Sequence, residues 1–298
     1  MSNQETITVY TPTFNRAYCL PQLYNSLLNQ TVNDFVWLII DDGSTDNTEE
    51  IVKIWIKQSP FKILYFKQIN EGKMEKVNFA HQFIDTELNM CVDSDDYLLN
   101  DSIEIILKEW EKIKFNQNIA GMVGLDVFKD HTVVGTKFPE NISISKFCYF
   151  DKIGAKGDKK FIYRSEITKK YPKYPSINGE KFPAPGYLYR LIDVDYNLWV
   201  FNKPLCVVEY LEDGLSKNKF KQFKMSPNSF VFYRQERMRL AINWIDRFKN
   251  AIHYVSSCMF ANKKFFEDNL YPITTILAIP FGILLNNYIK RTNKRGVV

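Results

Sequence analysis

The chain up to Phe115 alternates short apolar runs with longer stretches in which apolar residues recur at helical spacing. The apolar runs cover residues 6–10, 35–40, 63–66 and 90–92, and the helical stretches cover residues 20–30, 48–58, 74–84 and 102–115. This alternation predicts βαβ units, in which each helix crosses over between two parallel strands. We therefore expect an α/β fold, with a mainly parallel sheet flanked by helices.

Composition narrows the class of protein. A chain of 298 residues with 45% hydrophobic and 24% charged residues can bury a large core. The five cysteines stand far apart without a CxxC pair, which argues against a zinc site or a disulfide framework. A net charge of +5 is too small to indicate a nucleic-acid partner. The polar start of the chain does not resemble a secretory signal, so a cytoplasmic location is expected.

A polar motif follows each of the four predicted strands. The motifs are TPTFNR at residues 11–16, DDGSTDNT at 41–48, QINEGK at 68–73 and DSDD at 93–96. In open α/β sheets, ligands bind outside the carboxyl ends of the strands, where these motifs would meet. The sequence therefore predicts a ligand site at this edge of the sheet.

The last motif places Asp93, Asp95 and Asp96 close together, and their mutual repulsion would be offset by a divalent cation. Oxygen ligands without histidine or cysteine at ligand spacing favour Mg²⁺ or Mn²⁺, which often take one or two carboxylates and fill the other positions with phosphate oxygens and water. The alternative is an acidic turn before the helix that follows Asn100.

The paired residues Asp41 and Asp42 directly follow an apolar strand. A turn at Gly43 with a helix cap supplied by Ser44, Thr45 or Asp46 would account for the rest of that motif. It does not account for the pair of aspartates, one of which could accept hydrogen bonds from a base N–H or a ribose hydroxyl.

Together, TPTFNR, DDGSTDNT, NEGK followed by Asn78, and DSDD resemble, in this order and spacing, the family 2 glycosyltransferases of GT-A fold that build bacterial surface polysaccharides. The resemblance is specific over residues 11–96 and continues more weakly to about Asn218. It implies a nucleotide-binding α/β domain merged with an acceptor-binding half. It also implies inverting transfer from an activated sugar, usually UDP- or dTDP-linked, with Mn²⁺ or Mg²⁺ as cofactor.

The resemblance assigns roles to particular residues. Asp41 corresponds to the aspartate that contacts the base, Asp95 to the main metal ligand, and Asp93 to a second ligand nearer the ribose and diphosphate. Many members have an alanine and an arginine directly before Asn78, where this chain has Lys76 and Val77, so Lys73 is the candidate for the contact of that arginine. The full set expected to bind the nucleotide sugar is Thr11, Pro12, Arg16, Asp41, Asp42, Asn70, Lys73, Asn78, Asp93, Ser94 and Asp95.

Direct displacement also needs a base that takes the acceptor proton. Family members carry an acidic residue at the start of a helix about this far beyond DxD, and Glu180 is the best-placed candidate, ahead of the helical stretch 187–192. Close relatives often have another glutamate a few residues on, where this chain has Ala184, Pro185 and Gly186. The alternative for Glu180 is a solvated carboxylate in a loop.

The end of the chain carries an apolar stretch at residues 270–285, followed by Lys290, Arg291, Lys294 and Arg295. Pro272 and Pro280 interrupt it, and its roughly sixteen residues fall short of the roughly twenty that span a bilayer. It is expected either to lie in the interface of an anionic leaflet or to dock on the catalytic domain.

The expected domains are a catalytic domain over residues 1–218, with a nucleotide-sugar-binding half (1–120) and an acceptor half (121–218), and a helical region over 219–298 with a candidate membrane-interface segment at 270–295. The expected function is transfer of a sugar from a UDP-linked donor to a glycan or lipid-linked glycan, at the inner face of the cell membrane. Two alternatives are a nucleotidyltransferase, which usually has a glycine-rich loop after the first strand, and a non-catalytic protein that binds nucleotide sugars or glycans.

Overall fold

The computed structural model describes residues 5–177, 179–182, 184–209, 219–267 and 269–294. The chain divides into two compact units. The first unit comprises Met1–Lys173 and Leu188–Glu209, and the second comprises Tyr174–Tyr187 and Tyr210–Val298. The short segment 174–187 therefore belongs with the C-terminal helices, although it lies within the stretch that the sequence assigns to the acceptor half.

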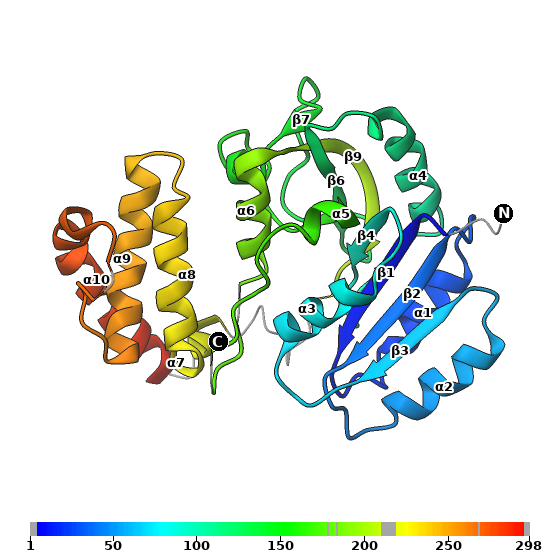
Figure 1. The fold of residues 1–298 in the computed structure, drawn as a ribbon, viewed down its shortest axis with the longest axis horizontal. Coiled ribbons are helices and arrows are strands. Elements are labelled where there is room, and N and C mark those ends of the chain that lie inside the picture. The colour runs from blue at the N-terminus through cyan, green and yellow to red at the C-terminus, as the bar shows by residue number, and fades with distance from the viewer. Residues whose placement is uncertain (1–4, 178, 183, 210–218, 268, 295–298) are drawn as a thin grey trace. The chain divides into compact units, whose positions relative to one another are not determined.

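The first unit begins with four parallel strands in the order β3-β2-β1-β4 (Figure 1). They are β1 (Ile7–Thr13), β2 (Phe35–Asp41), β3 (Ile63–Lys67) and β4 (Leu88–Cys91), and the crossover helices are α1 (Leu20–Leu28), α2 (Thr48–Gln58) and α3 (Lys73–Phe83). The predicted βαβ rhythm is confirmed. Every residue of β1 and β2 is buried, because helices cover both faces of a parallel sheet.

The remaining strands make the sheet mixed. β8 (Lys159–Arg164) pairs antiparallel with both β4 and β6 (Ile119–Val127), and β6 runs parallel to β9 (Asn197–Val207). Two short strands, β5 (Tyr97–Leu98) and β7 (Ile144–Ser145), pair antiparallel with β9. In the part of the chain that the structure describes, the sheet has nine strands, and the periodicity predicts its parallel part from β3 to β4 but not the parallel pair of β6 and β9. This unit also contains α4 (Ser102–Ile113), α5 (Ser165–Thr168), the 3₁₀ helix η1 (Phe147–Tyr149) and most of α6 (Gly186–Asp195).

The strand register brings the polar motifs to one edge of the sheet. Thr13 pairs with Asp41, and Asp41 pairs with Lys67, so β1, β2 and β3 end side by side. β4 runs parallel to β1 and pairs Cys91 with Tyr10, so the acidic motif emerges at the same edge. Behind this edge, Tyr24 stacks on Trp55 with ring centroids 4.3 Å apart, which packs α1 and α2 against β2.

The second unit is helical and contains α7 (Lys219–Met225), α8 (Pro227–Arg239), α9 (Trp244–Ala261) and α10 (Pro272–Lys294). The predicted helical stretch 229–255 is divided between α8 and α9, because the Asn243 side chain accepts a hydrogen bond from Asp246 N and starts a new helix.

The expected interruption of the C-terminal apolar stretch is not observed. α10 is one helix of 23 residues, with Pro272 at its first position and Pro280 within it. By length and composition alone, the part from Pro272 to Thr292 is long and apolar enough to cross a bilayer, with a mean hydropathy of 1.4.

Candidate active site

Asp41 ends β2 as a fully buried carboxylate. Its Oδ1 accepts a hydrogen bond from Ser44 N at 2.7 Å, and its Oδ2 accepts one from the Tyr65 hydroxyl at 2.5 Å. Burial, and then the hydrogen bond to Asp41, raises the pKa of Tyr65, so this tyrosine stays protonated as a donor. The expected turn at Gly43 is present, with a φ of 81°.

Asp42 holds the loop that precedes α3. Its carboxylate accepts hydrogen bonds from Glu71 N at 2.8 Å and Gly72 N at 2.9 Å, and Lys76 Nζ lies 3.4 Å away. The Asn70 amide donates to the Asp42 carbonyl oxygen at 2.8 Å. Asp42, Asn70 and the buried Lys76 therefore join the loops after β2 and β3, and their polar groups make contacts within the protein.

Lys73 joins the loop after β3 to the acidic motif after β4. Its Nζ lies 2.6 Å from Asp93 Oδ2. Burial disfavours the charged form of Asp93, but the attraction of Lys73 and its hydrogen bond outweigh burial and lower the pKa of Asp93. Burial likewise opposes the charge of Lys73, while Asp93 raises the pKa of the lysine. Both groups are therefore ionised at neutral pH.

Asp95 has a different environment from Asp93. Burial and the negative charge of Asp93 raise the pKa of Asp95, and Arg16 partly opposes this increase. Among the described residues, no basic side chain forms an ion pair with Asp95 within 4.0 Å. The loop after β1 reaches the same place, because the Cys19 thiol donates to the Ser94 carbonyl oxygen at 3.4 Å.

Three residues of the predicted donor set, Thr11, Pro12 and Asn78, are buried in the protein. Thr11 is fully buried, and its hydroxyl accepts a hydrogen bond from Trp37 Nε1 at 3.0 Å. Pro12 is buried within β1. The Asn78 amide donates to Glu75 Oε2 at 3.3 Å within α3. These residues support the strand and helix that carry the motifs.

A buried cluster beside the acidic motif was not predicted from the sequence. Lys160 Nζ, on β8, lies 3.9 Å from Asp96 Oδ2 and 3.8 Å from Asp126 Oδ1, which is on β6. Burial raises the pKa of Asp126 to about 6, and Lys160 opposes that increase. Burial also raises the pKa of Asp96 to about 8, again against the effect of Lys160. The pairing between antiparallel β6 and β8 creates this cluster, and no local motif marks it.

The donor atoms at this edge suit a hard divalent cation. No group of three or more His, Cys, Asp or Glu side chains in the described part of the chain has the geometry of a metal site. Mg²⁺ and Mn²⁺ sites that include a diphosphate need only one or two protein carboxylates, and Asp93 and Asp95 supply two from one loop. A cation there would also offset the repulsion that raises the pKa of Asp95.

Glu180 lies in the second unit, where its carboxylate contacts the start of α8. Its Oε1 accepts hydrogen bonds from Asn228 N at 2.9 Å and Asn228 Nδ2 at 2.7 Å. Its Oε2 accepts them from Ser229 N at 2.7 Å and the Ser229 hydroxyl at 2.9 Å. Glu180 is therefore not a free loop carboxylate, because it supplies acceptors to the unpaired N–H groups of a helix N-terminus.

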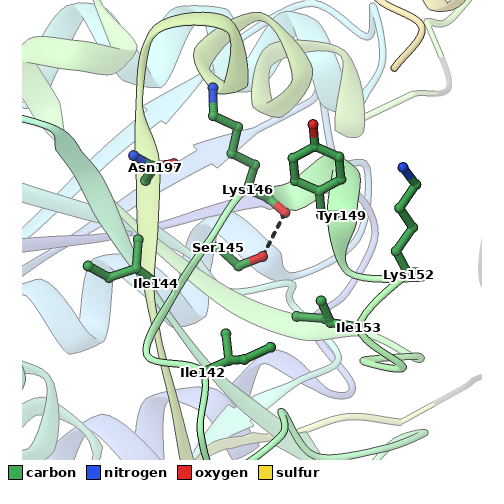
Figure 2. Close-up of a pocket in the computed structure, with 8 residues that line it drawn as sticks. All are labelled: Ile142, Ile144, Ser145, Lys146, Tyr149, Lys152, Ile153 and Asn197. Carbon is green, nitrogen blue, oxygen red and sulfur yellow. Dashed lines mark hydrogen bonds between the residues drawn. The ribbon is translucent and has the colours of Figure 1, made fainter. Parts of the chain in front are cut away.

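The first unit also has an open pocket of about 400 Å³ at β7 and the 3₁₀ helix. Figure 2 shows that Ile142, Ile144 and Ile153 line it together with Ser145, Lys146, Tyr149, Lys152 and Asn197. None of these residues belongs to the predicted donor set. The Lys146 ammonium donates to the Asp193 carbonyl oxygen, and the Lys152 ammonium lies 5.1 Å from the centre of the Tyr149 ring.

Two solved structures share this fold. S. aureus TarS 1–349 in complex with UDP-GlcNAc aligns with a TM-score of 0.59 and 15% identity, over 98% of this chain and 92% of that one. The mannosyltransferase PcManGT from Pyrobaculum calidifontis, in complex with GDP-Man and Mn²⁺, aligns with a TM-score of 0.56 and 13% identity, over 96% and 88%. The fold is therefore the GT-A fold that the motifs imply.

Curated relatives match about a third of the chain. The chondroitin synthase of Pasteurella multocida (strain Pm70) is 36% identical over 108 residues, which is 36% of this chain and 11% of that protein. The hyaluronan synthase of Pasteurella multocida matches to the same extent, so the chain spans about a ninth of the length of these relatives. The family model described as "Glycosyl transferase family 2" matches residues 8–171, more than half of the chain. This chain belongs to glycosyl transferase family 2.

Proposed function

We propose that the protein transfers a sugar from a uridine diphosphate sugar to an acceptor hydroxyl, with inversion at the anomeric carbon. The observation that carries this proposal is the meeting of four strand-end loops around Asp41, Lys73, Asp93 and Asp95. Family membership supports glycosyl transfer in general. The UDP-GlcNAc bound to TarS supports a uridine nucleotide, whereas PcManGT, which has a similar fold, binds GDP-Man, so the test below includes both nucleotides.

Each of these residues has a role in the proposed reaction. Asp41 is positioned by hydrogen bonds from Ser44 N and the Tyr65 hydroxyl, and its remaining lone pairs would accept a hydrogen bond from the base or ribose. Lys73 would attract the diphosphate while it keeps Asp93 ionised. Mg²⁺ or Mn²⁺ held by Asp93 and Asp95 would supply positive charge that offsets the charge on the departing diphosphate.

The base role of Glu180 stays a prediction. In the proposed displacement, a carboxylate takes the proton of the acceptor hydroxyl. The acceptor oxygen bonds to the anomeric carbon, and the bond between that carbon and the diphosphate breaks. The Glu180 oxygens already accept four hydrogen bonds from Asn228 and Ser229. A base role requires at least one of them to be released, or shared with the acceptor.

We propose that the acceptor is a glycan or lipid-linked glycan in surface glycan synthesis, and that transfer takes place at the inner face of the cell membrane. Chondroitin and hyaluronan synthases are polysaccharide-building relatives by name, which supports this context. Residues 1–218 would carry the reaction, with the acceptor contacts after residue 120. In the sequence, residues 209–216 resemble a loop near the end of the family's catalytic domain that can fold over the donor. Residues 210–216 lie outside the described residues.

The test is a panel of UDP, GDP and dTDP sugars, each measured for protection against thermal unfolding with and without Mn²⁺. We expect a UDP sugar with Mn²⁺ to stabilise the wild type, and Asp95→Ala to abolish that gain. Glu140→Ala is the matched control, because Glu140 is an exposed carboxylate of the same unit outside the donor set. Equal stabilisation of the Asp95→Ala variant would contradict the metal role. Binding of UDP sugars without turnover on any glycan would favour the non-catalytic alternative.

A further inference from the structure

α10 packs with its small and polar side chains inward. Its inward-facing residues recur at helical spacing and are Thr274, Thr275, Ala278, Gly282, Asn286 and Ile289. A Cβ atom on Gly282 would lie 2.5 Å from Val255 Cβ, so α10 and α9 touch backbone to side chain at this point. The Asn286 amide donates to the Ser256 carbonyl oxygen at 3.1 Å. α10 therefore meets α9 closely at Gly282 and through the buried Asn286 amide, and among these inward-facing residues only Ile289 has a large apolar side chain.

The outward face of α10 carries the large apolar side chains. Each of them exposes more than half of its surface, and they are Ile273, Ile276, Leu277, Phe281, Leu284 and Tyr288. A helix on the surface of a water-soluble domain normally turns such residues toward the core and its polar residues outward. α10 has the opposite arrangement, which is typical of helices that pack on one another through small residues and face lipid with large ones.

The start of α9 extends this apolar face. Trp244 and Ile245 are both more than half exposed. The Trp244 ring stacks on Phe248 with centroids 5.2 Å apart, and Phe248 meets Phe281 of α10 edge to face at 5.8 Å. Trp244, Ile245 and the outward residues of α10 form one surface, which we call the apolar face of the second unit. Tryptophan and tyrosine at its ends are the residues that favour the boundary between lipid and water.

The apolar face of the second unit could be covered by lipid or by a second copy of the chain, and the charges near it favour lipid. α10 contains no aspartate or glutamate, and its last turns expose Lys290 and Arg291. In the sequence, Lys294 and Arg295 follow. Between α9 and α10, Lys263 and Lys264 are balanced by Glu267 and Asp268. A second copy would bring the same cations without matching acids, whereas an anionic leaflet offers complementary charge.

The packing of α10 on α9 argues for a helix that lies on the membrane rather than one that crosses it. α9 carries Asp246, Arg247 and Lys249 in its first two turns. Because α10 is held against α9 by Gly282 and Asn286, insertion of α10 across a bilayer would either take those charges into hydrocarbon or separate the two helices. We propose that the apolar face of the second unit lies in the interface of an anionic lipid bilayer and holds the protein there.

The experiment measures binding of the full chain to lipid vesicles by flotation, without any donor, so its result is independent of glycosyl transfer. Vesicles of phosphatidylcholine with phosphatidylglycerol are compared with vesicles of phosphatidylcholine alone. We expect roughly tenfold stronger binding to the anionic vesicles, because the exposed cations Lys290 and Arg291 at the end of α10 would be attracted to the negative lipid headgroups. The paired substitution Leu277→Gln and Leu284→Gln is expected to reduce binding by at least roughly tenfold, because two large apolar side chains no longer enter the lipid.

The matched control is the pair Ile54→Gln and Ile56→Gln on α2, which likewise removes two exposed large aliphatic side chains from a helix but lies in the first unit. This control should bind vesicles like the wild type, and all variants should show the wild-type melting temperature. Equal binding of the α10 variant and the wild type would overturn the proposal. A concentration-dependent dimer in lipid-free solution that the α10 variant loses would assign the face to a second copy. Resistance to extraction by alkaline carbonate would show a spanning helix and would also overturn the proposal.

Discussion

Lys73 Nζ lies 2.6 Å from Asp93 Oδ2, and this ion pair joins the first residue of α3 to the loop after β4. The two residues are twenty positions apart in sequence and lie at the two ends of the β3-α3-β4 crossover, so the ion pair closes that unit. The contact sets the spacing between a cation that can attract a diphosphate and a carboxylate that can hold a metal ion. Substitutions of Lys73, Lys160 and His81 test the first unit, and a substitution of Glu180 tests the second.

Lys73→Met is expected to weaken binding of UDP with Mn²⁺ by roughly tenfold, because it removes a charge-assisted contact and the positive charge that keeps Asp93 ionised. Titration calorimetry measures the affinity. Lys67→Met is the control, since Lys67 is half-exposed and pairs with Glu49 at 2.9 Å on α2. An unchanged affinity for the Lys73 variant would remove Lys73 from the proposed donor site.

Lys160→Met should lower the free energy of unfolding by about 3 kcal/mol, because it leaves Asp126 as a buried carboxylate without its cation. Urea unfolding followed by circular dichroism measures the loss. The double variant Lys160→Met with Asp126→Asn removes both charges and should recover most of the stability. If the double variant is less stable than the single one, the two residues do not act as a pair.

Glu180→Gln should lower the melting temperature, because an amide NH₂ would replace one of the two oxygens that face the N–H groups at the start of α8. If Glu180 is the base, the variant also loses transfer while its affinity for UDP stays at the wild-type value. Ser229→Ala separates the two roles, because it removes one donor to Glu180 but keeps the carboxylate. A Glu180→Gln enzyme that transfers sugar at the wild-type rate would end the base assignment.

The contribution of His81 to the stability of the fold should decrease as the pH falls from about 6.5 to about 4. Burial, and then the charge of Lys169, lowers the pKa of His81 from 6.5 to about 4, so in this window the unfolded chain takes up a proton that the folded chain does not. The loss from this one residue is at most about 3 kcal/mol, since each pKa unit corresponds to about 1.4 kcal/mol.

His81→Leu should therefore reduce the slope of unfolding free energy against pH by up to one proton, measured by urea unfolding between pH 4 and pH 7. His131→Asn is the control, because His131 is exposed on a turn with a φ of 63°, a region that asparagine tolerates. A His81→Leu slope equal to that of the wild type would show that this histidine is not the acid-sensitive group.

The first half of the fold could be predicted because its signals are local. The apolar run before Asp41 and the run before Asp93 each mark a buried parallel strand, and the helical spacing between them marks the crossover helices. The second half could not be predicted in this way. β8 pairs with β4 and β6 through long-range contacts, so the cluster of Lys160, Asp96 and Asp126 has no signature in any short stretch of sequence.

Two details of the C-terminal part show the same limit. The prolines of α10 suggested a broken apolar stretch, yet Pro272 starts the helix and Pro280 lies within it, and packing against α9 accompanies the continuous form. Glu180 suggested a base in a loop, yet its carboxylate meets the N-terminus of a helix nearly fifty residues later. Neither contact follows from the residues next to it.

By itself, the sequence determined that the chain alternates strands and helices, that its polar motifs follow the strands, and that these motifs are those of a glycosyltransferase. Strand burial, helix periodicity and turn chemistry act over a few residues, so they can be recognised without the fold. The tertiary structure decided which carboxylates are paired, buried or held by a helix terminus, and which side of α10 faces outward. These properties depend on the neighbours that distant segments supply, because burial and charge interactions act through space and not along the chain.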